Sequence, residues 1–409
     1  MSAPASDRDT LRELARRVAE IAAEPVHDVK RDLWRRLNGL ERTRPLVWIN
    51  EIPWHEIPDV EPQCEDAFCR SLESSLRRTL HSWEHFRCDS VVDPFITCRT
   101  VIRDTGYGLE VSALRPEEFR GAKDYVPVIR EEADIEKICM PQVTVDAEAT
   151  ERRYQQMCDL VGDVLPVQRI GIAHMWCAPW DVLIQWWGIE ELYVDMLDRP
   201  GFVHKGIGRM MDALLCRLDQ YEKLGVLSVS NGNHRVGSGG LGITDELPQP
   251  DYDGEHARTM DQWGTSTGQI FSEVSPDMHE EFCLQYERRW LERFGLNCYG
   301  CCEPLDRKMG ILRSVPRLRR VSMSPWVDLD RAAAETGRDF IFSHKPNPAV
   351  LATERWNPDH ARSVLRDALE RTRACVVEVI MKDIETCRSE PHRIAEWCRL
   401  AVEVAEEFA

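Results

Sequence analysis

Four side chains of metal-binding type stand directly after short apolar runs that predict buried strands. They are His234, Cys301, His344 and Asp383. Imidazole, thiolate and carboxylate groups are the ligands that zinc takes in proteins, and three of them with one open position form a catalytic zinc site. If the ends of these strands meet in one space, the four residues are candidate zinc ligands.

The same strand ends carry groups that could act on protons without a metal. Lys382 stands directly before Asp383, and both could work with His344 to transfer protons and to stabilise developing negative charge. These three residues are therefore candidate catalytic groups. They keep open the alternative of a metal-free decarboxylase or lyase acting on a small carboxylic acid. A third interpretation is a non-enzymatic protein that binds a ligand.

Tryptophan is frequent in this chain, with 13 residues, and several of them follow predicted strands. Aromatic walls suit aromatic, planar or cationic ligands. The candidate substrate-binding residues are Trp54, Trp176, Trp180, Asn231 and Trp326. For any single tryptophan, packing at the end of the fold is the simpler alternative.

Apolar segments of strand length alternate with helical segments from residue 44 to residue 409. The predicted strands are 44–50, 90–101, 167–174, 226–230, 296–301, 317–323, 339–343 and 375–381. Eight strands, mostly each followed by a helix, predict a (β/α)8 TIM barrel, whose functional side chains collect at the carboxyl ends of the strands. An open doubly wound sheet is the alternative, but no glycine-rich phosphate loop follows the first strand.

Three segments depart from this alternation. Residues 1–43 hold two amphipathic helices, which predict an N-terminal helical extension packed outside the barrel of residues 44–409. Residues 103–145 lack a clear period and are interpreted as an insertion. Residues 232–270 include the glycine-rich stretch 237–242, and we interpret this excursion as a lid over the barrel mouth.

Composition limits the partners of the chain. Its 52 basic and 70 acidic residues give a net charge of −18, which repels nucleic-acid phosphates. The longest apolar stretches are too short to cross a membrane. Fifteen scattered cysteines favour reduced thiols in the cytoplasm over a disulfide framework. We expect a cytoplasmic enzyme with a small-molecule substrate and no nucleic-acid or membrane partner, and a homodimer stays open.

The C-terminal half also resembles the uroporphyrinogen decarboxylase superfamily, most of all its cobamide-dependent methyltransferase branch. The matching stretches are SPDMHEEFCLQYERRWLERFGLNCYGCCEPL, VSMSPWVDLDRAAAETGRDFIFSHKPNPAVL and VVEVIMKDIETCRSEPHRI. The resemblance implies the same (β/α)8 barrel. In the methyltransferases one strand ends in His-x-Cys-Gly, and its histidine and cysteine bind zinc. Here that place reads Tyr299-Gly300-Cys301-Cys302, so only the cysteine is kept.

The third zinc ligand of these methyltransferases is a cysteine at the end of the last strand, where this chain has Lys382 and Asp383. The resemblance implies that Asp383 replaces this cysteine and that His234 or His344 supplies the missing nitrogen. It implies a zinc-dependent methyltransferase that activates a thiol and exchanges a methyl group with a corrinoid carried by a partner protein. Strand alternation predicts that Cys302 turns away from Cys301.

Overall fold

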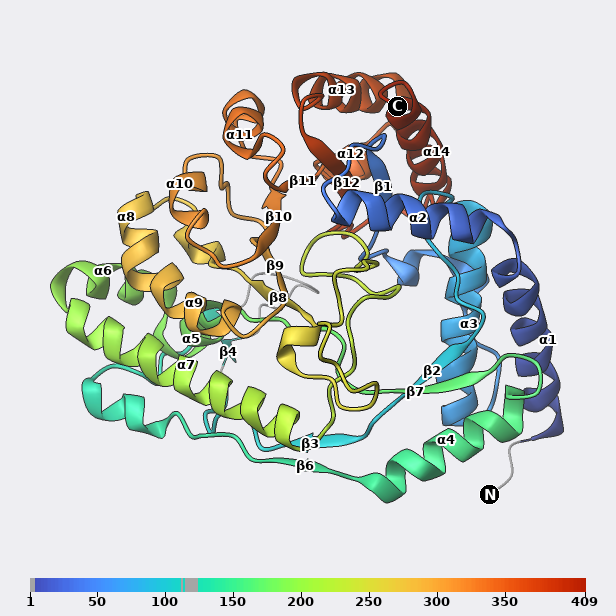
Figure 1. Cartoon of the computed structure of the whole chain (residues 1–409), viewed down its shortest axis with the longest axis horizontal. Helices are drawn as coiled ribbons and strands as arrows, with labels where there is room; N and C mark the ends of the chain where they lie inside the picture. Colours follow the sequence, from blue (N-terminus) through green and yellow to red (C-terminus); the bar gives the residue numbers. More distant parts are fainter. Residues whose placement is uncertain (1–3, 112, 115–123) are drawn as a thin grey trace.

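Six parallel strands form the central sheet of the protein, which curves around a loop in the middle of the molecule (Figure 1). The computed structural model describes residues 4–111, 113–114 and 124–409. The strand order is β1 (Leu46–Ile49), β12 (Val376–Met381), β11 (Ile341–His344), β10 (Leu318–Met323), β9 (Leu296–Tyr299) and β8 (Trp263–Ser266). Because all these strands run parallel, their carboxyl ends lie along one edge.

The remaining described strands form separate pairs. β2 (Ile96–Arg99) pairs in parallel with β7 (Val167–Ile170), while β3 (Ile102–Asp104) with β6 (Val143–Val145) and β4 (Ala113–Leu114) with β5 (Asp124–Tyr125) are antiparallel. Isolated parallel bridges connect Ile172 to Leu227 and Cys177 to Ser266. The predicted α/β architecture with a mostly parallel sheet is confirmed. A closed TIM barrel is not found among the described strands, since the sheet ends at β1 and β8.

Helices cover the outside of this sheet, with α14 packed on β1 and α9 on β8 (Figure 1). Many begin as the sequence indicates: the Asp66 carboxylate caps α3 by accepting from the backbone N–H groups of Phe68 and Cys69, and Asn357 caps α13 in the same manner. The α-helices are α1 (Ala5–Ala22), α2 (Val26–Asn38), α3 (Ala67–His85), α4 (Ala147–Val161), α5 (Pro179–Trp187), α6 (Ile189–Asp198), α7 (Pro200–Lys223), α8 (Pro276–His279), α9 (Gln285–Leu291), α10 (Met309–Leu312), α11 (Leu329–Thr336), α12 (Ala349–Ala352), α13 (Pro358–Arg371) and α14 (His392–Glu406).

The two faces of the sheet bury different chemistry. Val321, Phe342 and Val379 pack with the helices in the large apolar core. On the other face, Arg320 and Glu378 are completely buried and form an ion pair of 3.0 Å between Nε and Oε1. A buried ion pair needs further hydrogen-bond partners to offset the loss of hydration. The interior of the curved sheet is therefore polar, and other segments must supply hydrogen-bond partners for Arg320 and Glu378.

The glycine-rich stretch 237–242 supplies some of these hydrogen-bond partners. Residues 236–244 are buried, and the Gly240 N–H donates to Glu378 Oε1 over 3.1 Å. A Cβ on Gly239 would lie 2.4 Å from Arg320 Cδ, so only glycine permits this approach. The predicted lid is therefore wrong for this loop, which is packed inside the sheet (Figure 1). The same predicted segment also contains β8, a strand of the main sheet.

Helix α2 also packs against the interior of the curved sheet. Trp34 and Leu37 are buried against Leu46, Ile341 and Ile380, which lie on the inner face of the sheet. The sequence prediction placed the N-terminal helices outside the barrel. Helix α2 instead packs against the inner face of the sheet. Amphipathic spacing identified the helix, but it carries no information about which surface covers its apolar side.

The predicted insertion of 103–145 contains β4, β5, the 3-10 helix η3 (Glu132–Lys137) and β6, while its residues 112 and 115–123 lie outside the described part of the chain. In the residues that the structure describes, no helix combines the length and the apolar character that a membrane crossing needs.

Candidate active site at the strand ends

Two adjacent thiols and a lysine ammonium meet where β9 and β12 end. Lys382 Nζ lies 3.4 Å from Cys301 Sγ, 3.5 Å from Cys302 Sγ and 2.5 Å from Asp383 Oδ2. The two sulfur atoms are 3.5 Å apart, and the Cys302 thiol donates to Asp383 Oδ2 over 3.7 Å. Three of the residues predicted from the sequence, Cys301, Lys382 and Asp383, are thus brought into one cluster.

A glycine after β9 turns both thiols toward Lys382. Gly300 has a φ of +93°, and a Cβ there would lie 2.5 Å from Leu305 Cδ1. This left-handed residue breaks the strand alternation, so the prediction that Cys302 turns away from Cys301 is wrong. The buried Glu303 carboxylate holds the turn by accepting from the Cys301 N–H over 2.9 Å and from the Gly268 N–H over 3.1 Å.

A second carboxylate, Glu51 at the end of β1, supports the cluster from the other side. The Asp383 N–H donates to Glu51 Oε2 over 3.0 Å, and Arg235 donates to Glu51 Oε1 over 2.6 Å. Glu51 and Asp383 have φ values of 54° and 57°, in the left-handed region that few non-glycine residues adopt. Sequence reasoning did not single out the roles of Glu51 and Arg235, since only the fold brings them to Asp383.

The neighbours of the two thiols give them opposite acidities. The hydrogen bond from Cys301 and the nearby Lys382 cation lower the pKa of Cys302, although burial opposes the shift. The same hydrogen bond and burial raise the pKa of Cys301. Burial alone would lower the pKa of Lys382, but the thiols and Asp383 raise it, so the lysine stays cationic. Cys302, the exposed member of the pair, is therefore the thiol that forms a thiolate more readily.

The four predicted zinc ligands do not gather into a metal-binding group among the described residues. His344 lies on the face of β11 that carries Phe342, and its Nδ1 is buried without a hydrogen-bond partner in the described chain. His234 is packed against Gly242, and burial lowers its pKa to about 3. The Lys382 ammonium contacts both Cys301 and Asp383, so a cation already occupies the place that zinc would need. This ligand set does not fit zinc as it stands.

Residues of the right types for zinc gather instead behind β9. His279, Cys283 and Glu287 follow each other at intervals of four along α8, the π-helical turn η6 (Glu280–Leu284) and α9. Their ligand atoms lie within 4.8 Å of one another, and all three residues are buried. The Tyr299 hydroxyl lies 2.7 Å from His279 Nε2 and donates to Glu287 Oε2 over 2.7 Å. Burial raises the pKa of Glu287 to about 7.

The predicted substrate-binding residues do not form one wall. Trp180 is fully buried, with its ring 5.3 Å from that of Phe271, while Trp176 and Trp326 are 40% and 71% exposed. Asn231 donates to the Leu247 carbonyl over 3.1 Å, a contact within the interior loop. Trp54 lines a cavity beside α3, and Trp326 lines a different cavity of about 410 Å³. A role in packing explains Trp180 and Asn231 better than substrate binding.

Comparison with solved structures finds a protein of similar fold. Neither the protein-family models nor the curated proteins contain a match to this chain. The fold is similar to that of a solved structure, a methyltransferase from Methanosarcina mazei, with a TM-score of 0.51 and 9% sequence identity. The likeness covers 91% of this chain and 96% of the other. At this identity the similarity shows the fold alone.

Proposed function

We propose that the chain is a methyltransferase and that the Cys302 thiol is its reacting group. The observation that carries the proposal is the contact of two thiols with the Lys382 ammonium at the ends of β9 and β12. Methyl transfer to sulfur requires a thiolate, and a neighbouring cation favours that form. Active sites of α/β proteins with parallel strands lie at this edge of the sheet. The similar fold of a methyltransferase also supports methyl transfer as the class of reaction.

The proposed step is a nucleophilic displacement at the methyl carbon. The Cys302 thiolate forms a bond to the methyl carbon as the bond to the leaving group breaks, and the leaving group takes the electron pair. Before the step, Lys382 balances the charge of the thiolate, and Asp383 fixes the ammonium by its contact of 2.5 Å. Afterwards the sulfur is a neutral thioether, so the Lys382 cation no longer faces a thiolate and favours an anionic leaving group.

The proposed methyl donor or acceptor is a corrinoid on a partner protein. The other reactant is a small-molecule substrate. A corrinoid would supply a cobalt-bound methyl group that is open to attack by a thiolate. We also propose the cytoplasm as the compartment, because all 15 cysteines are unpaired.

We assign any zinc of the protein to His279, Cys283 and Glu287, not to the strand-end thiols. One nitrogen, one sulfur and one carboxylate are a suitable donor set for zinc. Two of their atoms, His279 Nδ1 and Glu287 Oε1, are buried without hydrogen-bond partners in the described residues. Metal analysis should show that Cys283→Ser loses bound zinc and that Cys301→Ser retains it; the reverse pattern contradicts the assignment.

Methylation of the protein itself tests the proposed function. Methylcobalamin is incubated with the protein, and peptide mass spectrometry locates any gained methyl group. We expect one methyl group on Cys302, none in Cys302→Ser, and a reduced amount in Cys301→Ser. Methyl iodide serves as a control for the accessibility of the thiol. If methyl iodide modifies Cys302 but methylcobalamin does not, or if Cys302→Ser is methylated equally, the proposal is wrong.

The alternative function is a metal-free lyase that decarboxylates a small carboxylic acid. It is favoured by the Lys382–Asp383 contact and by the pKa of Asp383, which burial and Glu51 raise above its usual range. An acid with a raised pKa can return a proton to a carbanion. In this case Asp383→Asn abolishes turnover while Cys302→Ser retains it, which is the opposite of the result expected for methyl transfer.

A further inference from the structure

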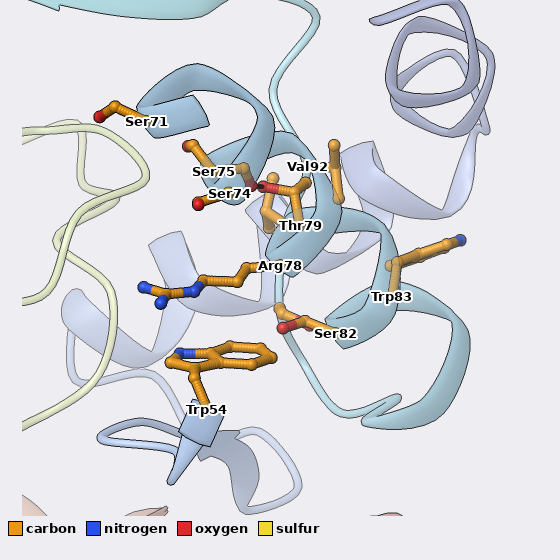
Figure 2. A pocket seen from close by; sticks show the side chains of 11 residues that line it. Trp54, Ser71, Ser74, Ser75, Arg78, Thr79, Ser82, Trp83 and Val92 are labelled. Atoms are coloured by element: carbon orange, nitrogen blue, oxygen red, sulfur yellow. Dashed lines mark hydrogen bonds between the residues drawn. The ribbon is translucent and has the colours of Figure 1, made fainter. Parts of the chain in front are cut away.

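A polar groove lies beside α3, outside the thiol cluster (Figure 2). Its volume is about 530 Å³; one face of the helix forms most of its wall, and Trp54 and residues 90–92 complete the lining. Residues three and four positions apart share a helix face, and this face carries hydroxyl groups at Ser71, Ser74, Ser75, Thr79 and Ser82. The hydroxyls line the groove but do not by themselves define a ligand.

Arg78 gives the groove its charge. Its guanidinium lies over the ring of Trp54, 5.4 Å from the ring centre, and Figure 2 shows it directed to the same side as Ser71 and Ser74. The preceding residue, Arg77, forms an ion pair with Glu73 over 2.7 Å. Among the described residues no such carboxylate partner is found for Arg78. The guanidinium is therefore held in place by an aromatic ring while its N–H groups face the groove.

A second cavity of about 710 Å³ continues the groove and shares Ser71, Ser75 and Thr79 with it. The second cavity adds two more basic residues, Arg99 and Arg153, and the apolar side chains of Phe68 and Met157.

One carboxylate, Asp93, lines the second cavity, and it is already neutralised. It forms an ion pair with Arg31 over 3.1 Å and accepts from Asn233 over 3.0 Å. Three basic groups thus face a lining with no free carboxylate, in a chain whose net charge is −18. Such a local excess of positive charge attracts small anions.

We propose that this groove binds a small organic anion, with its carboxylate or phosphate group on Arg78. A guanidinium donates two parallel hydrogen bonds to either group, and the hydroxyls of Ser71 and Ser75 can donate to the remaining oxygens. The apolar part of the ligand then lies along Phe68 and Met157. The inference does not depend on the proposed methyl transfer, although Trp54 and Glu51 belong to the same segment after β1.

Calorimetry on the full chain tests the inference, with phenyl phosphate, benzoate and inorganic phosphate as probes. Loss of charge-assisted hydrogen bonds predicts at least about tenfold weaker binding of the organic anions to Arg78→Gln. Arg78→Lys, which keeps the charge without the paired donors, should bind with intermediate affinity. Arg16→Gln removes the same charge from the exposed side of α1 and should bind like the unchanged protein.

The probes also separate the two parts of the groove. Phenyl phosphate should bind more tightly than inorganic phosphate, and Met157→Ser should weaken phenyl phosphate and benzoate but not inorganic phosphate. Circular dichroism shows whether each variant is folded. If neither organic anion binds the unchanged protein, or if folded Arg78→Gln binds both as tightly, the inference is overturned.

Discussion

Two clusters that combine thiols with carboxylates flank strand β9, and they differ in what surrounds them. Behind the strand, Cys283 and Glu287 are sealed by helices, and burial raises the pKa of both groups. At the end of the strand, Cys302 is exposed, and its pKa is lowered by Cys301 and Lys382. Residue type alone therefore does not locate the chemistry in this protein. A neighbouring cation and access to solvent distinguish a reactive thiol from a structural one.

The largest difference between the clusters should be their rate of alkylation. Iodoacetamide at neutral pH should modify Cys302 at least about 100-fold faster than Cys283 in the folded protein, because only the thiolate reacts and Cys283 is buried. Peptide mass spectrometry over time measures both rates. Lys382→Met should slow Cys302 about tenfold, since a pKa change of one unit changes the thiolate fraction about tenfold.

Lys205→Met is the matched control, because Lys205 is an exposed lysine on α7 that pairs with Glu132. It should leave the Cys302 rate unchanged. Similar rates for Cys302 and Cys283 would remove the distinction between the two clusters.

Stability should separate the clusters in the opposite direction. Tyr299→Phe removes the hydroxyl between His279 and Glu287 and leaves buried polar atoms without partners. This should lower the free energy of unfolding by about 1–3 kcal/mol. Cys302→Ser changes an exposed side chain and should cost less than about 0.5 kcal/mol. Urea denaturation measures both, and equal costs would show that the Tyr299 network is not structural.

The two clusters should also respond to pH in opposite directions, because the pKa values of Glu287 and Glu51 are shifted to opposite sides of 4.5. In the protein without bound metal, burial raises the pKa of Glu287 from 4.5 to about 7, so its contribution to stability is present below pH 4.5 and is lost as the pH rises through 7. Burial opposes the shift of Glu51, but Asp383 and Arg235 lower its pKa to about 2. Its contribution is present above pH 4.5 and is lost as the pH falls toward 2.

Urea denaturation at a series of pH values tests these signs. Glu287→Gln should flatten the pH dependence between 4.5 and 7, and Glu51→Gln should flatten it between 2 and 4.5. A Glu287→Gln profile that still falls between pH 5 and 7 would assign the effect to another group.

Most of the sheet could be predicted from the sequence because its strands are apolar runs bounded by helix ends. The exceptions have physical reasons. β8 (Trp263–Ser266) was missed because it is buried with Gly264, Thr265 and Ser266 in place of an apolar run. The predicted strand 226–230 forms a single bridge, since the chain then turns into the interior loop.

The site was predictable where strand ends alone decide position, and not where side-chain direction decides it. Cys301, Lys382 and Asp383 meet as expected. His344 does not reach the cluster, because its side chain lies on the same face of β11 as Phe342. The next residue, Lys345, contacts Ser343 on the inner face. Gly300 was the signal that Cys302 belongs to the cluster, but its left-handed φ is visible only in the structure. The hydroxyl face of α3 has helical spacing in the sequence, yet an exposed polar face is also what any surface helix has.

The glycine-rich loop makes the inside of the curved sheet a blind end. Ser238 Oγ donates to the carbonyl of Gly300, the residue directly before the two thiols. Helix α2 packs against the inner face of the sheet and closes the rest of this space. Under the proposed methyl transfer, Cys302 carries the methyl group between two half-reactions, so we expect the donor to depart before the acceptor arrives. Steady-state kinetics of such a protein follow a ping-pong scheme, with parallel lines in double-reciprocal plots.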